Sequence, residues 1–223
     1  MKRLAFSDVS GKWKAAFVET YNKRIVGSNP FATQRRRLTR HSEWVMPTVE
    51  KDVPFLSRQE VEIRAADVLR EHGLESIPVD PVVLANRLGM AVYNAKFSDD
   101  NIVGMIAKRG DQITLLVNQS DPPFRKRFTI AHELGHHFLH LIGDGEFVDS
   151  EANLFRLPQD DQQDITPQRR REIQANMFAA ALLMPADAVR SEWKRLHSVD
   201  AMARKFNVSE AAMGIRVGQL GLD

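Results

Sequence analysis

Cysteine is absent from this 223-residue sequence, and tyrosine occurs only twice. The absence of cysteine excludes disulfides, thiol nucleophiles, iron–sulfur clusters and cysteine-bound zinc. Long apolar segments are also missing, because the longest uninterrupted run, 177–184, has eight residues where a membrane-spanning helix needs about 20. The N-terminal residues lack the apolar stretch of a secretory signal. We therefore expect a soluble, cytoplasmic protein that makes no contact with membranes.

Charge is nearly balanced, with a formal net charge of +2, but it is unevenly distributed. Residues 1–60 contain 12 Lys and Arg against 6 Asp and Glu. A basic segment can contact nucleic acid or an acidic partner, although charge by itself more often marks a solvated surface. Trp13, Phe17 and Tyr21 recur every four residues, which indicates one short amphipathic helix. We interpret residues 1–57 as a basic N-terminal extension whose role is open.

Cap residues and prolines divide the remainder into helices and strands. The expected elements are, in order, a helix capped by Ser57 and ending at Gly73, a short helix opened by Pro81 and ended by Gly89, strands at 90–94, 102–108 and 113–118, a helix from Pro123 to about 142, a helix from Pro167 to 184, and two or three short helices between 186 and 220. The three strands are expected to form a small antiparallel meander. Residues 144–164 hold seven acidic side chains and one Arg, which indicates a long surface loop.

The motif H-E-x-x-H, formed by His132, Glu133 and His136, falls within one expected helix. Two histidines four residues apart lie about 40° apart around a helix and about 6 Å apart along it, so both rings can bind one Zn²⁺. Glu133, next to the first ring, can accept a proton from an attacking water. With 7 His and 13 Glu in the chain, roughly 0.01 accidental matches are expected. The sequence therefore predicts a zinc site with Glu133 as general base.

A catalytic zinc usually has three protein ligands and one open position. The extended motif with a third histidine requires Gly at position 139 and His at position 142, where this sequence has Leu139 and Ile142. His140 lies about 12 Å along the helix from His132, too far for both to share one metal, and His137 points away from the pair. For His137 and His140 we expect supporting or surface roles, so the third ligand comes from another element.

The candidate third ligand is a carboxylate. Glu172 lies in the second long helix, and the small residues Ala175 and Ala179 on the same face would let this helix approach the first closely. Asn176, also on this face, is placed to hydrogen-bond a ligand histidine and fix its tautomer. We favour Glu172, and the alternative is Glu151 in the acidic segment, where no helix clearly supports it.

Two motifs together resemble a known family. Residues 127–136, Arg-Phe-Thr-Ile-Ala-His-Glu-Leu-Gly-His, and residues 172–185, Glu-x-x-Ala-Asn-x-Phe-Ala-Ala-x-Leu-Leu-Met-Pro, are similar to the ImmA/IrrE metallo-endopeptidases. The resemblance extends upstream through 78–81, 101–104 and 113–118 and covers about residues 58–222. Residues 1–57 have no counterpart in it.

The resemblance implies a minimal gluzincin with an α+β, zincin-like fold, in which helices surround a three-stranded antiparallel sheet. It implies one Zn²⁺ per chain, bound by His132, His136 and Glu172, with Glu133 as general base. Family members are typically encoded by bacteria or phages and cleave helix-turn-helix repressors, which switches on genes for stress response, mobile-element transfer or prophage induction. The repressor substrate rests on the resemblance alone.

The C-terminal segment has the spacing of a helix-turn-helix, with the turn residue Asn207 between two short helical stretches. One interpretation is DNA binding through the helix after Ser209, with Arg204, Lys205 and Arg216 on phosphates. That helix, however, offers few side chains suited to reading base edges. We favour a helical hairpin that packs on the peptidase or docks its substrate.

These observations predict a basic extension at 1–57, a zinc metallopeptidase domain at 58–185 and a helix-turn-helix-like segment at 186–223. An edge strand of the meander is expected to pair with an extended substrate segment. Candidates for stabilising the oxyanion are Tyr93, His137 and His140. Two alternatives remain: a DNA-binding regulator, and a toxin–antitoxin-type component that acts by tight binding. In both alternatives the zinc site would be structural.

Overall fold

The computed structural model describes residues 55–97, 102–109, 111–140, 145–150 and 166–222. With the exception of Phe97, these residues belong to one compact unit. The expected helix through Trp13, Phe17 and Tyr21 and the alternative ligand Glu151 lie outside the described residues.

The first two helices begin where the sequence predicts. Helix α2, Arg58–Glu71, starts with a capping box in which the Ser57 hydroxyl accepts from the Glu60 N–H and the Glu60 carboxylate accepts from the Ser57 N–H. Its apolar positions 61, 65, 68 and 69 are buried. Helix α3, Pro81–Arg87, is capped by Asp80, whose carboxylate accepts from the Val82 N–H at 2.9 Å.

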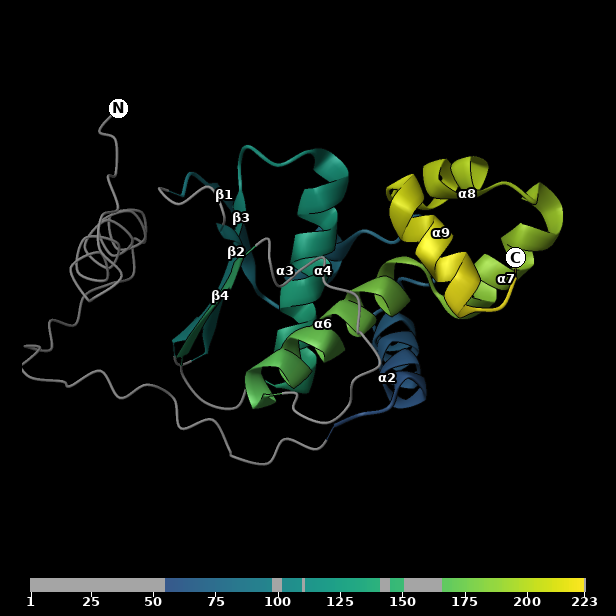
Figure 1. Ribbon diagram of the computed structural model, residues 1–223. Helices are drawn as coiled ribbons and strands as arrows, with labels where there is room; N and C mark the ends of the chain where they lie inside the picture. The colour runs from purple at the N-terminus through teal and green to yellow at the C-terminus, as the bar shows by residue number, and fades with distance from the viewer. Residues whose placement is uncertain (1–54, 98–101, 110, 141–144, 151–165, 223) are drawn as a thin grey trace, which may run out of the picture. The chain divides into compact units, whose positions relative to one another are not determined.

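The three predicted strands are present, but they form a mixed sheet. Their bounds are β1 Ala91–Ala95, β2 Ile102–Arg109 and β3 Gln112–Asn118. The sheet order is β1-β3-β2-β4, with β1 parallel to β3 and the other pairs antiparallel. The expected purely antiparallel meander is therefore wrong. Strands β2 and β3 form a hairpin, β4 pairs with the other edge of β2, and β1 pairs with the other edge of β3 (Figure 1).

Strand β4, Gly145–Ser150, lies in the segment that was expected to be a surface loop. It pairs antiparallel with β2 over most of its length. The polar composition of the segment concealed a strand that is only six residues long. Its backbone groups pair with those along the second edge of β2, a long-range partnership that composition does not reveal.

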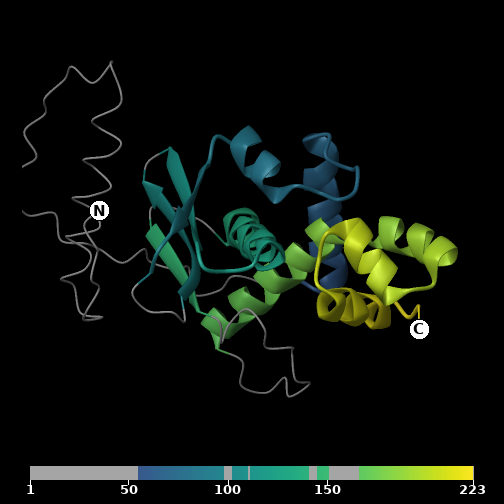
Figure 2. The ribbon, with the colours of Figure 1, turned by 90° about the horizontal axis from the view of Figure 1, so that it is seen from above.

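Two long helices lie on either side of β4 in the chain order. Helix α4, Pro123–Leu139, packs against β2 and β3 on one side and against α6, Pro167–Leu183, on another (Figures 1 and 2). Residues 129–136 of α4 are consequently all buried. The helix ends before residue 142, the expected end, because His140 leaves helical geometry and serves as its C-cap.

Three short helices complete the chain, as predicted: α7 Ala186–Leu196, α8 Val199–Phe206 and α9 Glu210–Gln219. Asn207 adopts the expected left-handed conformation between α8 and α9, with φ of 54°. Buried residues of this segment, among them Met202, Phe206 and Val217, belong to the same hydrophobic cluster as Val61 and Leu134. The C-terminal helices and the rest of the described unit therefore share one core.

Within the described residues, the structure contains no helix that is both long enough and apolar enough to cross a membrane.

Candidate metal centre

Helix α4 places His132 and His136 on one face, one turn apart. Both residues are fully buried, and their Nε2 atoms are 3.0 Å apart. The two rings meet edge to face, with centroids 4.7 Å apart. Four-residue spacing in a helix thus gives the convergence that the H-E-x-x-H motif predicts.

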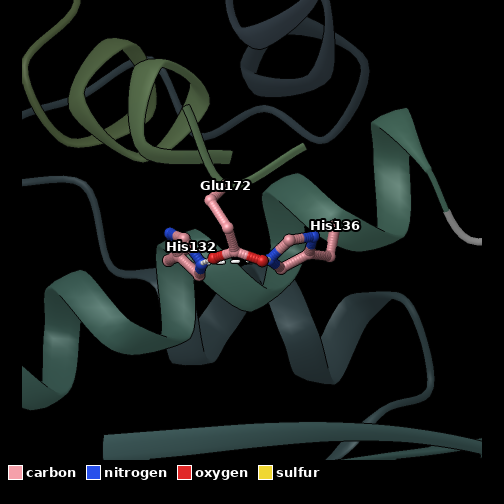
Figure 3. A group of neighbouring side chains, drawn as sticks. All are labelled: His132, His136 and Glu172. Carbon is pink, nitrogen blue, oxygen red and sulfur yellow. Dashed lines mark hydrogen bonds and ion pairs between the residues drawn. The ribbon is translucent and has the colours of Figure 1, made fainter. Parts of the chain in front are cut away.

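Helix α6 brings Glu172 to the same point. Its Oε2 lies 3.4 Å from His132 Nε2, and its Oε1 lies 3.7 Å from His136 Nε2. Figure 3 shows the carboxylate between the two rings. The three candidate ligand atoms lie within 4.8 Å of one another, and all three residues are buried. The sequence selected this carboxylate over Glu151, and the structure brings it to the histidines.

A close helix–helix contact makes this possible. A Cβ atom added at Gly135 would lie 2.9 Å from Ala175 Cα and 3.0 Å from the Ala175 carbonyl oxygen. Ala175 and Ala179 are fully buried at the same interface. Small residues on both helices therefore let the two backbones approach until a glutamate side chain of α6 reaches rings carried by α4.

Asn176 fixes the orientation of the His132 ring. Its Oδ1 lies 2.9 Å from His132 Nδ1. An amide oxygen only accepts, so Nδ1 of His132 carries the hydrogen and Nε2 keeps its lone pair. The sequence predicted that Asn176 would contact a ligand histidine, and the contact is present.

The ring of His136 contacts His140. His136 Nδ1 lies 3.3 Å from His140 Nδ1, and His140 Nε2 lies 2.8 Å from Gln174 Oε1. Burial lowers the pKa of His140 to about 4, so the ring is neutral at neutral pH. The supporting role expected for His140 agrees with this contact. Gln174 was missed, because nothing in its sequence position indicates that it faces His140.

The donor set fits a small divalent cation. Two imidazole Nε2 atoms and a carboxylate present three electron-pair donors within a few ångströms, and such donors repel one another unless a cation lies among them. Ligand bonds of about 2.0–2.1 Å in tetrahedral geometry place ligand atoms about 3.3 Å apart. The two Nε2 atoms are 3.0 Å apart, and the carboxylate lies at similar range, with Oε2 3.4 Å from His132 Nε2 and the other oxygen, Oε1, 3.7 Å from His136 Nε2. Nitrogen and carboxylate ligands in this number are typical of zinc sites.

The sequence matches the peptidase M78 family, described as the IrrE N-terminal-like domain, over residues 85–217. That range covers more than half of the chain and includes both helices of the metal centre. The chain belongs to this family. The resemblance to ImmA/IrrE proteins found in the motifs is thereby confirmed.

Comparison with solved structures finds similarity to a Mycobacterium tuberculosis transcriptional regulator, with a TM-score of 0.49 and 20% sequence identity. The match covers 71% of this chain and 46% of that one, so this chain corresponds to less than half of the regulator's length. A search of curated proteins gave no match.

In this M78 family domain, Glu133 is fully buried and faces strand β2. A Cβ atom added at Gly104 would lie 2.8 Å from Glu133 Oε1 and 2.4 Å from Thr129 Cγ2. Glycine at position 104 therefore lets the sheet backbone pack directly over the expected general base. The signal for this contact was a glycine inside an apolar strand, which often marks a close backbone approach.

The candidates for oxyanion stabilisation occupy different surroundings. His140 is bound to His136 and Gln174, as described above. Tyr93, on the edge strand β1, is 48% exposed. His137 is half-buried, and its pKa is lowered by burial and further by Lys108. The role of each in stabilising an oxyanion stays a prediction.

Proposed function

We propose that this M78 family member is a zinc-dependent endopeptidase. The observation that carries the proposal is that His132 Nε2 and His136 Nε2, on the helix that also holds Glu133, meet the Glu172 carboxylate of α6 with all three candidate ligand atoms within 4.8 Å of one another. A structural zinc is usually closed by four ligands and has no need of a neighbouring carboxylate. Among the residues that the structure describes, the cluster has three ligands, and these together with a buried glutamate of the same motif favour a hydrolytic centre.

The residues of the centre have three separate roles: metal binding, proton transfer and orientation of a ligand ring. His132, His136 and Glu172 would hold the metal, which polarises the scissile carbonyl and lowers the pKa of water when it is bound. Glu133 accepts the proton of the attacking water and returns it to the leaving amine. Asn176 holds the ring of His132 in the orientation that binding requires.

The proposed substrate is a helix-turn-helix repressor, cut at a specific bond so that the genes it controls are released. The family resemblance supports this class of substrate. An extended segment of the repressor would add to an edge strand of the sheet, and among the described strands β1 and β4 are the two edges.

Metal binding is the first test. We expect one zinc per chain by metal analysis of the purified protein, and a higher unfolding temperature with zinc than after chelation, because a ligand that binds the folded state stabilises it. Ca²⁺ at the same concentration is the control, since it prefers six or more oxygen ligands. A chain without zinc and without a zinc-dependent shift would contradict the proposal.

Cleavage is the second test, made by co-expression with the helix-turn-helix protein encoded beside the gene. Intact mass should show one new pair of fragments with the wild-type chain. Glu133→Gln should retain zinc and reduce cleavage by about 10²- to 10⁴-fold, because it removes the base and keeps the shape of the side chain. Glu71→Gln, an exposed position of α2, is the matched control and should cleave normally.

The alternative of a DNA-binding regulator has less support. Arg216, one of three cations expected to contact phosphates, is 1% exposed and pairs with Glu62. Specific DNA binding that persists in Glu133→Gln, with no cleavage by the wild type, would favour this alternative. Stoichiometric binding of the partner without product would favour the toxin–antitoxin alternative.

A further inference from the structure

We infer that His140 and Gln174 are positioning residues that hold the ring of His136 in the one tautomer able to bind the metal. This inference rests on the proposed metal site and adds two residues to it. Both are buried, with 7% of His140 and 1% of Gln174 exposed. Both act through His136, a role separate from the oxyanion stabilisation for which His140 is also a candidate.

The argument starts at Gln174. Its Oε1 lies 2.8 Å from His140 Nε2, and because an amide oxygen only accepts, the hydrogen of a neutral His140 ring is on Nε2. His140 Nδ1 then has a lone pair and accepts. The group 3.3 Å from it is His136 Nδ1, which must donate. His136 Nε2, the atom that faces Glu172 and His132, therefore keeps its lone pair.

The reverse direction is incompatible with metal binding. If the Gln174 amide donated to His140 Nε2, the hydrogen of His140 would be on Nδ1 and would point at His136 Nδ1. His136 would then carry its own hydrogen on Nε2, where it would block the metal. The metal can bind only when Gln174 accepts from His140 Nε2 and His140 Nδ1 accepts from His136 Nδ1. In that arrangement His136 Nε2 keeps the lone pair that faces the centre.

The direction of these hydrogen bonds matters for metal binding because the rings are buried. A ring nitrogen in water can exchange its partner, but a buried one must be satisfied by the protein. Helix α6 thus supports both ligand rings of α4: Asn176 contacts His132 directly, and Gln174 reaches His136 through His140. The same helix supplies the ligand Glu172.

The direct test is nitrogen NMR of the histidine rings in the wild-type chain, with and without zinc. We expect the hydrogen of His140 on Nε2 and that of His136 on Nδ1 in the zinc-bound protein. A hydrogen on Nδ1 of His140 would overturn the inference. This readout requires no substrate and no variant.

Paired variants test the same chain of bonds by zinc affinity, measured in competition with a chelator. Gln174→Met removes the acceptor at similar size and should weaken zinc binding about 10- to 100-fold, as loss of a bond to a ligand histidine commonly does. Gln174→Glu keeps an acceptor and should stay within a few-fold of the wild type. His140→Leu and His140→Asn form a second pair, in which Asn restores an acceptor close to the position of Nδ1.

The outcomes separate the inference from the proposed function. A wild-type chain that binds no zinc would contradict the metal site itself. A wild type that binds zinc, together with Gln174→Met and His140→Leu variants of unchanged affinity, would overturn the positioning role alone. Thermal unfolding of the metal-free variants shows whether they fold. If neither apolar variant folds, the ring tautomers measured by NMR in the wild type decide whether the inference holds.

Discussion

The placement of single hydrogens on imidazole rings determines whether α4 can hold a metal at all. His132 donates from Nδ1 to Asn176, and His136 contacts His140 through Nδ1, so both rings turn Nε2 toward Glu172. A polar side chain that accepts at the back of a ligand ring therefore contributes to metal affinity, commonly by about 10- to 100-fold.

Asn176 provides a prediction at this scale. Asn176→Leu removes the acceptor with little change in size, and we expect about 10- to 100-fold weaker zinc binding, because the His132 ring loses its fixed tautomer. Asn176→Asp retains an acceptor and serves as the control. Chelator competition measures both variants, and equal affinities for Asn176→Leu and wild type would contradict the role.

At the scale of elements, the centre depends on how closely α4 and α6 approach. Gly135→Ala would introduce a methyl group 2.9 Å from Ala175 Cα, where backbone and not a flexible side chain must yield. We expect a loss of about 1–3 kcal/mol in unfolding free energy, as for overpacked cores, and weaker zinc binding as Glu172 moves away. Urea unfolding of the metal-free protein and a zinc titration measure the two effects.

Gly214 of α9 is the matched control for this change. The nearest atom to a Cβ added there is Val199 Cγ1, at 3.9 Å, which is ordinary contact. Gly214→Ala should be neutral or stabilising by up to about 1 kcal/mol, because alanine favours helix. Equal effects of the two substitutions would show that the α4–α6 contact tolerates more separation than we expect.

The start of α2 gives a prediction on pH. The hydrogen bond from the Ser57 hydroxyl, followed by that from the Ser57 backbone, lowers the pKa of Glu60 from its ordinary value of 4.5. A lowered folded-state pKa contributes stability that is present above the ordinary value and is lost as the pH falls through the lowered one. Ser57→Ala should cost about 1 kcal/mol at pH 7.

Part of this cost should disappear as the pH falls from 4.5 through the lowered pKa of Glu60, because protonation weakens the bond that the carboxylate accepts from the Ser57 hydroxyl, whereas the cap bond from the Glu60 N–H to that hydroxyl remains. Urea unfolding of wild type and Ser57→Ala at several pH values makes the comparison. Ser57→Thr, which keeps a hydroxyl cap, is the control and should follow the wild type. A difference that stays constant down to acid pH would contradict the coupling.

For the whole molecule, Arg216 joins the C-terminal helices to the rest of the core. Its Nε donates to the Met184 carbonyl at 3.0 Å, and its guanidinium pairs with both oxygens of Glu62 on α2. The helix-turn-helix-like segment is thus anchored by a buried cation and by the shared hydrophobic cluster. A role for Arg216 on DNA phosphates would require breaking this pair.

Removing one partner tests the anchor. Glu62→Leu should destabilise the chain by about 3–5 kcal/mol in urea unfolding, because it leaves a buried cation unpaired. The double variant Glu62→Leu with Arg216→Met should recover much of the loss, because the uncompensated charge is gone. Equal stability of Glu62→Leu and the wild type would indicate that Arg216 reaches solvent and is available to a partner.

The sequence by itself determined the local features. The helices expected to start after Ser57, at Pro81 and at Pro167 do start there. The side chains of Ser57, Asp80 and Thr166 accept backbone N–H groups within the next few residues, so local pattern suffices to predict these starts. The convergence of His132 and His136 is also local, because one helical turn separates them. Glu172 could be predicted as the third ligand because the small residues on its helix face indicate a close helix pair.

Only the tertiary structure decided the remainder. The order of strands and the parallel pairing of β1 with β3 depend on which sheet edges other strands occupy. Strand β4 is recognisable only through its pairing with the second edge of β2. The partnership of His140 with Gln174 depends on how α4 crosses α6, which no spacing within either helix specifies. These features arise from contacts between residues distant in the chain, whose geometry the folded core sets and the local sequence pattern does not.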